Sequence, residues 1–316
     1  MSKRQLPLFP SQPASSDDIS KITPIGATFD LFRKYLIREG KSQHTVKAFI
    51  GDMNLLTEHT GEDTPISTYT TTILNDYLDW MEHRRGVSCS RKTYARRVTT
   101  LKVYFKWLKQ IEAIKHDPSA AVLQRSGPAP LSDVLMPAQV DAVIAVAQKQ
   151  KKKDEPDYRP ELLFHLLLQT GIKKSETGRL TLEDFEVEET ANPSVLIRHK
   201  SRNVYKERRL DLEDDFVPLL DAYITQYKPD DTLFDCTTRN LEYILTALGE
   251  EAGVPFKLSF EVMRWTMAVR AWRAGEDEQA IRESMGLSET TWYETSKKIK
   301  RLIAQQVAAE NMPTNQ

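Results

Sequence analysis

The stretch LQRSGPAPLSD at residues 123–133 limits the possible folds of this chain more than any other feature. Gly127, Pro128 and Pro130 interrupt any helix or strand there, because proline lacks a backbone N–H and glycine favours turns. A chain of 316 residues has the length of about two domains. We therefore expect two separately folded parts joined by a linker at residues 123–136.

The part before the linker has the periodicity of helices only. Residues 1–26 are rich in Pro, Ser and Asp and are predicted to form a disordered tail. In residues 27–122 apolar residues recur at helical spacing, and Ser42 and Ser90 stand where two of the helices begin. The four helical segments are 29–40, 42–61, 71–84 and 90–111. They predict a small all-α bundle.

The part after the linker, residues 137–306, combines helical and strand patterns. Short β-type runs at 194–200 and 207–212 flank the polar turn SRNVYK and predict a hairpin. The helical patterns lie at 137–150, 158–171, 214–226, 239–252, 260–274, 277–285 and 289–307. This part is predicted to be α+β, mostly helical with a small sheet, and residues 307–316 to be a tail. The chain as a whole is expected to be mainly α.

Basic residues are unevenly distributed, although the formal net charge is only −1. Residues 84–109 contain nine basic and no acidic side chains, whereas acidic residues concentrate at 182–189 and 212–215. This asymmetry indicates one cationic face suited to the phosphates of nucleic acid. A solvated helix face without a ligand is the alternative. The residues expected to bind DNA are Arg91, Lys92, Arg96, Arg97, Lys102 and Lys106.

Composition argues against a disulfide-rich, secreted or membrane-spanning protein. The two cysteines, Cys89 and Cys236, are far apart and give no disulfide framework. The first residues have no apolar signal segment, and no stretch approaches the roughly 18 apolar residues of a membrane span. We expect a soluble, cytoplasmic protein without a membrane partner.

Several stretches resemble the motifs of the tyrosine recombinase (phage integrase) family in its Xer-like form, and they occur in that family's order. In the first part, Ser42–Thr45 opens the second helix, and the basic fourth helix ends in FKWL before the exit DPSAAV. In the second part the similar stretches are LLLQTGIKKSETGRLTLEDF, IRHKSRNVYKERRLDL and the segment from FEVMRW to TSKKI. The resemblance covers residues 28–305. It implies a core-binding, SAM-like helical domain followed by a tyrosine-recombinase catalytic domain.

The resemblance also implies a reaction. In this family a tyrosine hydroxyl attacks a DNA backbone phosphate and forms a 3′-phosphotyrosine, with no metal ion or other cofactor. Two arginines hold the phosphate oxygens, a lysine protonates the leaving 5′-oxygen, and histidines add hydrogen bonds or base catalysis. The implied partner is double-stranded DNA, bound by a homo-oligomer (a dimer or a tetramer).

Carried over to this chain, the family's catalytic set is only partly present. The second arginine falls on Arg264, whereas the first falls on Lys173. A lysine keeps the charge but lacks the planar guanidinium group that binds two phosphate oxygens at once. The lysine falls on Lys200, with Lys206 as a second candidate. Tyr293 is the candidate nucleophile, and it lies closer to the second histidine position than is usual in the family.

Both histidine positions of the family are replaced. Glu261 occupies the first, three residues before Arg264 and therefore on the same helical face. Leu287 occupies the second. An ionised Glu261 would repel a phosphate. All six histidines precede residue 200, so a shifted alignment restores neither position.

These residue types also fit purely structural roles. Lys200 is typical of a hairpin surface as well, and Tyr293 beside Trp292 is typical of helix packing. For Arg264 on an apolar helix, a structural salt bridge with Glu261 or another acidic residue is the competing explanation. Three functions follow: a site-specific recombinase, a recombinase-derived DNA-binding factor that no longer cleaves, and a protein-binding adaptor. The basic fourth helix argues against the adaptor.

Overall fold

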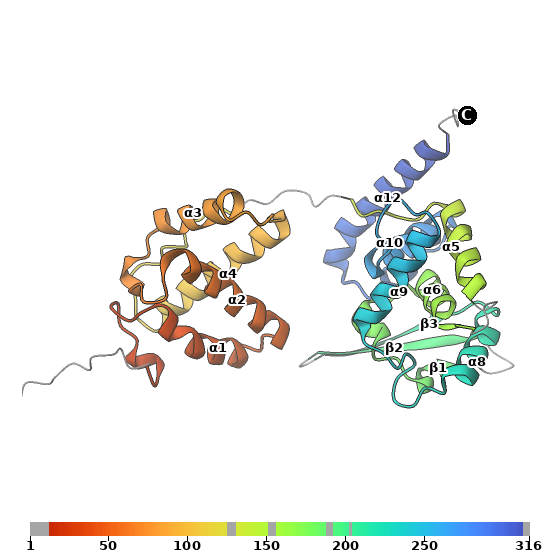
Figure 1. Cartoon of the computed structure of the whole chain (residues 1–316), viewed down its shortest axis with the longest axis horizontal. Helices are drawn as coiled ribbons and strands as arrows, with labels where there is room; N and C mark the ends of the chain where they lie inside the picture. The colour runs from red at the N-terminus through yellow and green to blue at the C-terminus, as the bar shows by residue number, and fades with distance from the viewer. Residues whose placement is uncertain (1–12, 125–130, 151–155, 188–191, 202–203, 312–316) are drawn as a thin grey trace, which may run out of the picture. The chain divides into compact units, whose positions relative to one another are not determined.

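The chain divides into two compact units, Met1–Ala129 and Pro130–Gln316 (Figure 1). The division falls within the predicted linker, and the domain limits drawn from the sequence stay predictions. The residues described by the computed structural model are 13–124, 131–150, 156–187, 192–201 and 204–311.

The first unit is a bundle of helices, as its periodicity predicts. Ser42 and Ser90 cap the two helices predicted to begin there, because each accepts a hydrogen bond from the N–H three residues ahead, at 3.2 and 3.1 Å. A short π-helix, Trp80–Arg84, continues the third helix. The α-helices of this unit are α1 (Phe29–Arg38), α2 (Gln43–Thr60), α3 (Thr71–Asp79) and α4 (Arg91–Gln110).

Aromatic side chains of α4 form the centre of this bundle. Tyr104, Phe105 and Trp107 are buried. Phe32 of α1 contacts Tyr104 and Trp107, with ring centroids 5.0 and 5.3 Å apart. The Tyr104 hydroxyl lies 2.6 Å from that of Thr28, so its polar end is also satisfied. The burial of this face makes α4 amphipathic, with its basic residues on the other side.

The predicted disordered tail extends too far along the chain. Ile19 and Ile25 are buried in the first unit, and the Ile25 N–H donates to the Thr64 carbonyl at 3.0 Å. The tail's polar composition did not reveal these anchors, and Ile22, which lies between them at the same spacing of three, is 72% exposed. Residues 1–12 lie outside the described residues.

The second unit contains one small antiparallel sheet with strand order β1-β2-β3. Strands β2 and β3 pair from Ser194↔Asp211 to Ser201↔Val204, which confirms the predicted hairpin; its residues 202–203 lie outside the described ones. The strands are β1 (Phe185–Glu186), β2 (Ser194–Ser201) and β3 (Val204–Asp211). The unit is therefore α+β and mostly helical, as predicted.

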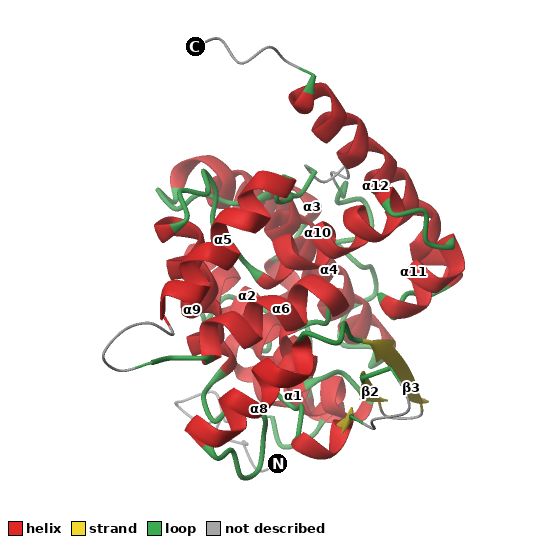
Figure 2. Ribbon diagram, turned by 90° about the vertical axis from the view of Figure 1, so that its right-hand side faces the viewer, coloured by secondary structure: helices red, strands yellow, loops and turns green. Residues whose placement is uncertain are grey.

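Helix α6 (Arg159–Thr170) is the centre of the second unit. Leu163, Phe164 and Leu167 are fully buried, because α6 contacts α5, α8, α9 and α10. The other helices are α5 (Pro137–Gln150), α7 (Lys174–Thr177), α8 (Phe216–Tyr227), α9 (Thr238–Glu251), α10 (Phe260–Arg273), α11 (Glu278–Ser284) and α12 (Glu289–Glu310). The C-terminal end of α12 extends beyond its neighbours (Figure 1 and Figure 2). None of the helices in the described part of the chain has both the length and the hydropathy of a membrane span.

Candidate functional site

A buried carboxylate, Glu176, is the centre of a basic cluster in the second unit. Gly171 ends α6 in the left-handed conformation (φ 56°), which redirects the chain into Lys173 and α7. The Lys173 N–H donates to Glu176 Oε2 at 2.8 Å. Arg208 of β3 donates to both carboxylate oxygens, at 3.1 and 2.8 Å. This two-point ion pair joins the sheet to the segment that carries Lys173.

The charge of Glu176 is stabilised in spite of its burial. Burial alone would raise the pKa of Glu176. The hydrogen bonds from Arg208 and from the Lys173 N–H, with the positive charges of both side chains, outweigh burial and lower the pKa below that of an ordinary glutamate. Only 13% of the Arg208 side chain is exposed, so this pair is a buried one.

Lys173 lies beside the ion pair and lines a cavity of about 1340 Å³. Its ammonium is 3.9 Å from Glu176 Oε1. Burial lowers the pKa of Lys173, Glu176 acts in the opposite direction, and the charges of Arg264 and Arg208 lower it further. These three basic side chains therefore belong to one electrostatic cluster.

Arg264 of α10 donates to carbonyl oxygens and forms no ion pair with another described residue. Its Nη1 donates to the Gly171 carbonyl at 2.8 Å, and its Nη2 donates to the Met285 carbonyl. Among the described residues no carboxylate lies within 4.0 Å of this guanidinium, and Glu261 is exposed. The structure thus contradicts the salt bridge between Arg264 and Glu261. Burial lowers the pKa of Arg264, Glu176 raises it, and Arg208 lowers it again.

The cavity beside Lys173 contains further basic side chains. Lys206 and Arg270 line it together with Leu287. The backbone of Lys200 pairs with Tyr205 near the end of β2, but the Lys200 side chain lies outside the described part of the structure. Of the two candidate hairpin lysines, Lys206 is the one whose side chain is described, and it lines the cavity.

Tyr293 does not line this cavity. It lies in the second turn of α12 with 62% of its surface exposed, and the Lys297 ammonium is 3.7 Å from the centre of its ring. The adjacent Trp292 stacks on Trp272, with ring centroids 6.1 Å apart. The packing role suggested by the sequence thus belongs to Trp292. The structure brings Lys173 close to Arg264 but does not bring Tyr293 to them.

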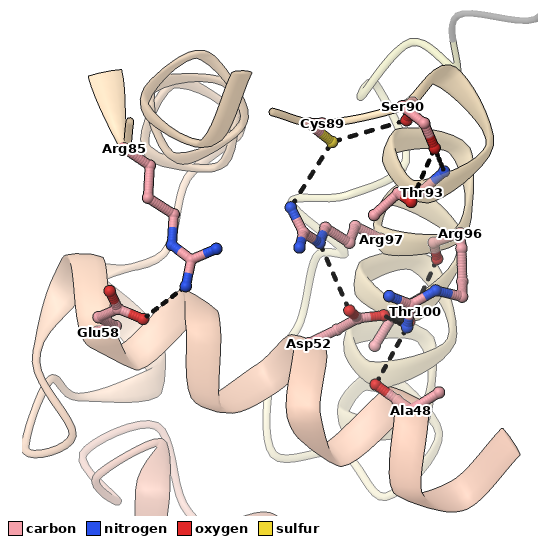
Figure 3. A network of polar contacts seen from close by, with 10 residues as sticks. All are labelled: Ala48, Asp52, Glu58, Arg85, Cys89, Ser90, Thr93, Arg96, Arg97 and Thr100. Atoms are coloured by element: carbon pink, nitrogen blue, oxygen red, sulfur yellow. Dashed lines mark hydrogen bonds and ion pairs between the residues drawn. The ribbon is translucent and has the colours of Figure 1, made fainter. Parts of the chain in front are cut away.

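In the first unit, a buried carboxylate holds two of the residues predicted to bind DNA (Figure 3). Asp52 of α2 accepts hydrogen bonds from Arg96 Nη1 at 2.5 Å and from Thr100 Oγ1 at 2.8 Å. Arg97 Nε is 3.6 Å from the other carboxylate oxygen. The exposed fractions are 39% for the Arg96 side chain and 14% for that of Arg97. Both arginines fasten α4 to α2, and Arg97 has little surface left for a ligand.

The other basic residues predicted for this interface are less constrained. Arg91, Lys92 and Lys106 are exposed, and Lys102 is half-buried. No ion pair joins any of these four to another described residue. They stay candidates for phosphate contacts.

Sequence reasoning did not identify Glu176 or Arg208. Side chains alternate between the two faces of a strand, so Arg208 shares a face with the buried Leu210. An arginine on the apolar face of a predicted strand is expected to be buried and therefore to pair with an acidic residue, and this was the signal in the sequence.

Two family models match the chain. The model "Phage integrase, N-terminal SAM-like domain" matches residues 29–112, and the model "Phage integrase family" matches residues 133–298. Each match falls within one of the two units.

Named relatives match over different lengths. Tyrosine recombinase XerC of Mycobacterium sp. (strain KMS) is 25% identical over 296 residues, which cover 88% of this chain and 96% of the relative. Tyrosine recombinase XerC of Mycobacterium leprae is 29% identical over 163 residues, or 51% of this chain. The chain spans about half of that relative, 54% of its length.

Solved structures agree in fold. XerH site-specific recombinase bound to a palindromic difH substrate has a TM-score of 0.69 at 15% identity, covering 96% of this chain and 98% of that one. A lambda integrase dimer bound to a COC′ core site has a TM-score of 0.67 at 14% identity, covering 86% and 77%. At these identities the likeness concerns the fold alone.

Proposed function

The chain belongs to the phage integrase family, and from this premise we propose that it binds a specific site in duplex DNA and cleaves and rejoins strands there through Tyr293. The observation that carries the proposal is Arg264, a largely buried guanidinium whose acceptors are two neutral carbonyls. A buried charge without a counter-ion is costly, and an anion held by the guanidinium removes part of that cost. A DNA backbone phosphate is such an anion, and the named relatives are tyrosine recombinases.

In the proposed reaction the basic cluster holds the phosphate. Arg264 donates to its non-bridging oxygens, and Lys173 adds a point charge beside it. The Tyr293 oxygen forms a bond to phosphorus while the bond from phosphorus to the 5′-oxygen breaks. Lys200 or Lys206 gives a proton to the 5′-oxygen, and Glu261 accepts the phenol proton. The reaction balances without a metal ion or another cofactor.

A DNA-binding factor without cleavage is the second candidate. It is favoured by Lys173 in place of an arginine, and by Glu261 and Leu287 in place of histidines. The position of Tyr293 outside the cavity also favours it. Removing one preorganised donor typically lowers a rate by about 10²–10³-fold, and several such losses make cleavage negligible. Both candidate functions include binding to a specific site in duplex DNA.

The proposed DNA contacts of the first unit are four basic residues of α4 that form no ion pair within the described part of the chain. Each phosphate that they neutralise releases counterions, which gives affinity without sequence preference. They are Arg91, Lys92, Lys102 and Lys106, with the exposed part of Arg96 beside them. We propose that the protein assembles on DNA as a dimer or tetramer and acts in the cytoplasm.

The test is a covalent adduct on a nicked duplex. Selection of bound DNA from a random pool supplies the site, and an SDS gel detects protein joined to a strand. A recombinase gives an adduct that Tyr293→Phe abolishes. Lys173→Arg increases the adduct, because the guanidinium group of arginine binds two phosphate oxygens at once. Tyr243→Phe is the matched control, since Tyr243 on α9 is 55% exposed.

Each outcome separates the candidates. Binding without an adduct supports the second candidate. An adduct that survives Tyr293→Phe contradicts the assignment of the nucleophile. A protein that selects no DNA contradicts both candidates.

A further inference from the structure

Residues 131–136, the last part of the predicted linker, are packed into the second unit. Leu135 is buried in the main apolar core of this unit. Leu131 and Val134 pack against a smaller apolar cluster, to which α10, α11 and α12 contribute. Figure 1 shows the chain passing α12 on its way from the grey trace to α5. The segment 131–135 thus joins the two apolar clusters of the second unit.

Two buried side chains hold the backbone of Leu135. The Leu135 N–H donates to Thr266 Oγ1 of α10 at 3.0 Å, and Gln306 Nε2 of α12 donates to the Leu135 carbonyl at 2.9 Å. Thr266 is fully buried, and Gln306 is only 5% exposed. A buried backbone group without a partner is costly, and here two side chains replace the partners that a helix or sheet would supply. The course of the segment therefore depends on α10 and on α12 at once.

The side-chain amide of Gln306 is fixed in one orientation. Its Oε1 accepts a hydrogen bond from Arg273 Nη1 at 3.2 Å, and a guanidinium can only donate. The amide nitrogen then faces the Leu135 carbonyl, which can only accept. Arg273 is itself held by a two-point ion pair with Glu310 of α12, at 2.7 and 3.1 Å. A chain of hydrogen bonds thus runs from the end of α10, through Gln306 of α12, to the linker segment.

The contacts of the segment depend on α12 lying against α10. Ile299 and Leu302 of α12 belong to the smaller apolar cluster against which Leu131 and Val134 pack. If the C-terminal half of α12 leaves α10, the Leu135 carbonyl loses the Gln306 amide, and Val134 loses apolar contacts in the same step. The reverse also holds, because the coupling between two parts of a structure is reciprocal. Loosening the segment therefore weakens the attachment of α12.

We propose that Gln306 makes α12 the anchor of the connection between the two units. While α12 lies on α10, residues 131–134 are part of the second unit. When the C-terminal half of α12 detaches, these residues become connecting chain and lengthen the connection by roughly 13–14 Å in the extended state. The position of α12 therefore sets how much chain joins the units. This inference goes beyond the proposed function, because it requires neither DNA binding nor cleavage.

The experiment is peptide-resolved amide hydrogen exchange of the full chain, wild type against Gln306→Glu. This variant keeps the length of the side chain and the acceptor for Arg273, but it replaces the donor to the Leu135 carbonyl with a carboxylate oxygen. Because a buried carbonyl is then left without its donor, exchange at residues 131–136 should be about tenfold faster, and exchange at 162–168 of α6 should be unchanged. Gln305→Glu makes the same chemical change at the adjacent, exposed position and should exchange as wild type does.

A second variant tests the reciprocal effect of the segment on α12. Val134→Ser removes an apolar side chain from the segment and leaves the sequence of α12 unaltered. We expect faster exchange at residues 303–310 of α12 as well as at 131–136, because the two parts are coupled. Asp133→Ser, at the neighbouring exposed position, is the control and should leave exchange in α12 unchanged.

Limited digestion with thermolysin measures the release of the segment independently. This protease cuts before apolar residues, and the segment offers Leu131, Val134 and Leu135. Gln306→Glu should raise the rate of cleavage within 131–136 by about the same factor as the rate of exchange, because both report the population of the open form. Gln305→Glu should be cut there no faster than wild type.

Support for the anchor requires faster exchange at 131–136 in Gln306→Glu, with α6 unchanged, and faster exchange at 303–310 in Val134→Ser. Unchanged exchange at 131–136 in Gln306→Glu overturns the proposal. An equal acceleration in α6 overturns it too, because Gln306 would then support the whole unit rather than the segment. If Gln306→Glu does not fold, Val134→Ser decides alone, and unchanged exchange at 303–310 overturns the anchor.

Discussion

Each unit of the molecule buries a carboxylate that binds arginines, Asp52 in the first unit and Glu176 in the second, and the two differ in how they engage the arginines around them. In the first unit Asp52 binds Arg96 and contacts Arg97, so basic residues of the predicted DNA-binding helix become part of the fold. In the second unit Glu176 pairs with Arg208, whereas Arg264 has no carboxylate within 4.0 Å among the described residues. The first carboxylate draws the charge of Arg96 into the fold, whereas in the second unit the part-buried guanidinium of Arg264 donates to two carbonyl oxygens.

The pKa values of these carboxyl groups shift in opposite directions for a physical reason. Burial raises the pKa of Asp52 more than Thr100, Arg96 and Arg97 lower it. For Glu176, the two-point bond from Arg208 and the backbone N–H outweigh burial. Asp52 has only one hydrogen bond from an arginine, because Arg97 stays 3.6 Å away. Charge-assisted hydrogen bonds, rather than the number of nearby arginines, decide which effect is larger.

Removal of Arg208 should have the largest effect. Arg208→Met leaves Glu176 buried without its bidentate partner, and breaking a buried pair in this way costs about 3–5 kcal/mol of unfolding free energy. Amide exchange should show the loss in the second unit only. Arg209→Met, which removes an exposed neighbour on β3 paired with Glu186, should cost about 1 kcal/mol or less. Equal effects of the two variants would contradict the importance of the Glu176 pair.

Asp52→Asn should have a smaller effect, confined to the first unit. The neutral amide still accepts a hydrogen bond, and the raised pKa of Asp52 means that its ionised form is less well stabilised. We expect a loss of about 1–3 kcal/mol, measured by amide exchange in α2 and α4. Asp30→Asn, at an exposed position of α1, is the control. A loss as large as that of Arg208→Met would remove the contrast between the units.

The dependence of stability on pH should differ in sign between the two carboxyl groups. The pKa of Glu176 is lowered in the folded state, so its contribution is present above pH 4.5, its ordinary value, and is lost as pH falls below it. The pKa of Asp52 is raised, so its contribution is present below pH 3.8 and is lost as pH rises above it.

Denaturant titrations of Glu176→Gln and Asp52→Asn against wild type, followed by exchange in each unit, would measure this. The deficit of Glu176→Gln should shrink toward acid pH, and that of Asp52→Asn should shrink toward neutral pH. Slopes of the same sign would disprove the contrast.

The smallest effect on stability, with a clear effect on binding, is expected from the exposed basic residues. Replacing Arg91 and Lys92 with glutamine should reduce the slope of log affinity against log salt by about two units. Amide exchange in the first unit should not change. Arg96→Gln with Arg97→Gln should instead speed exchange in α2 and α4, because it leaves Asp52 without its partners. An unchanged slope in the first variant would exclude this end of α4 from the DNA interface.

Local signals in the sequence were sufficient for the architecture. Ser42 and Ser90 start their helices because a cap needs only the N–H group three residues ahead. The short β-type runs on either side of SRNVYK were sufficient for the hairpin, since strand pairing there is local. The order of the motifs was sufficient for the family. Ile19 and Ile25 escaped notice because they stand in a stretch whose overall composition is polar.

The tertiary structure alone decided which basic residues pair with a carboxylate and which do not. Asp52 and Arg96 are 44 residues apart, Glu176 and Arg208 are 32 apart, and Arg264 reaches a carbonyl 93 residues away. The sequence identified Arg96, Arg97, Lys173 and Arg264 as charged residues on helices or near a motif, but it contained no sign of their partners. Charge is a property of one residue, whereas pairing depends on which distant segments pack together, and no local periodicity encodes that.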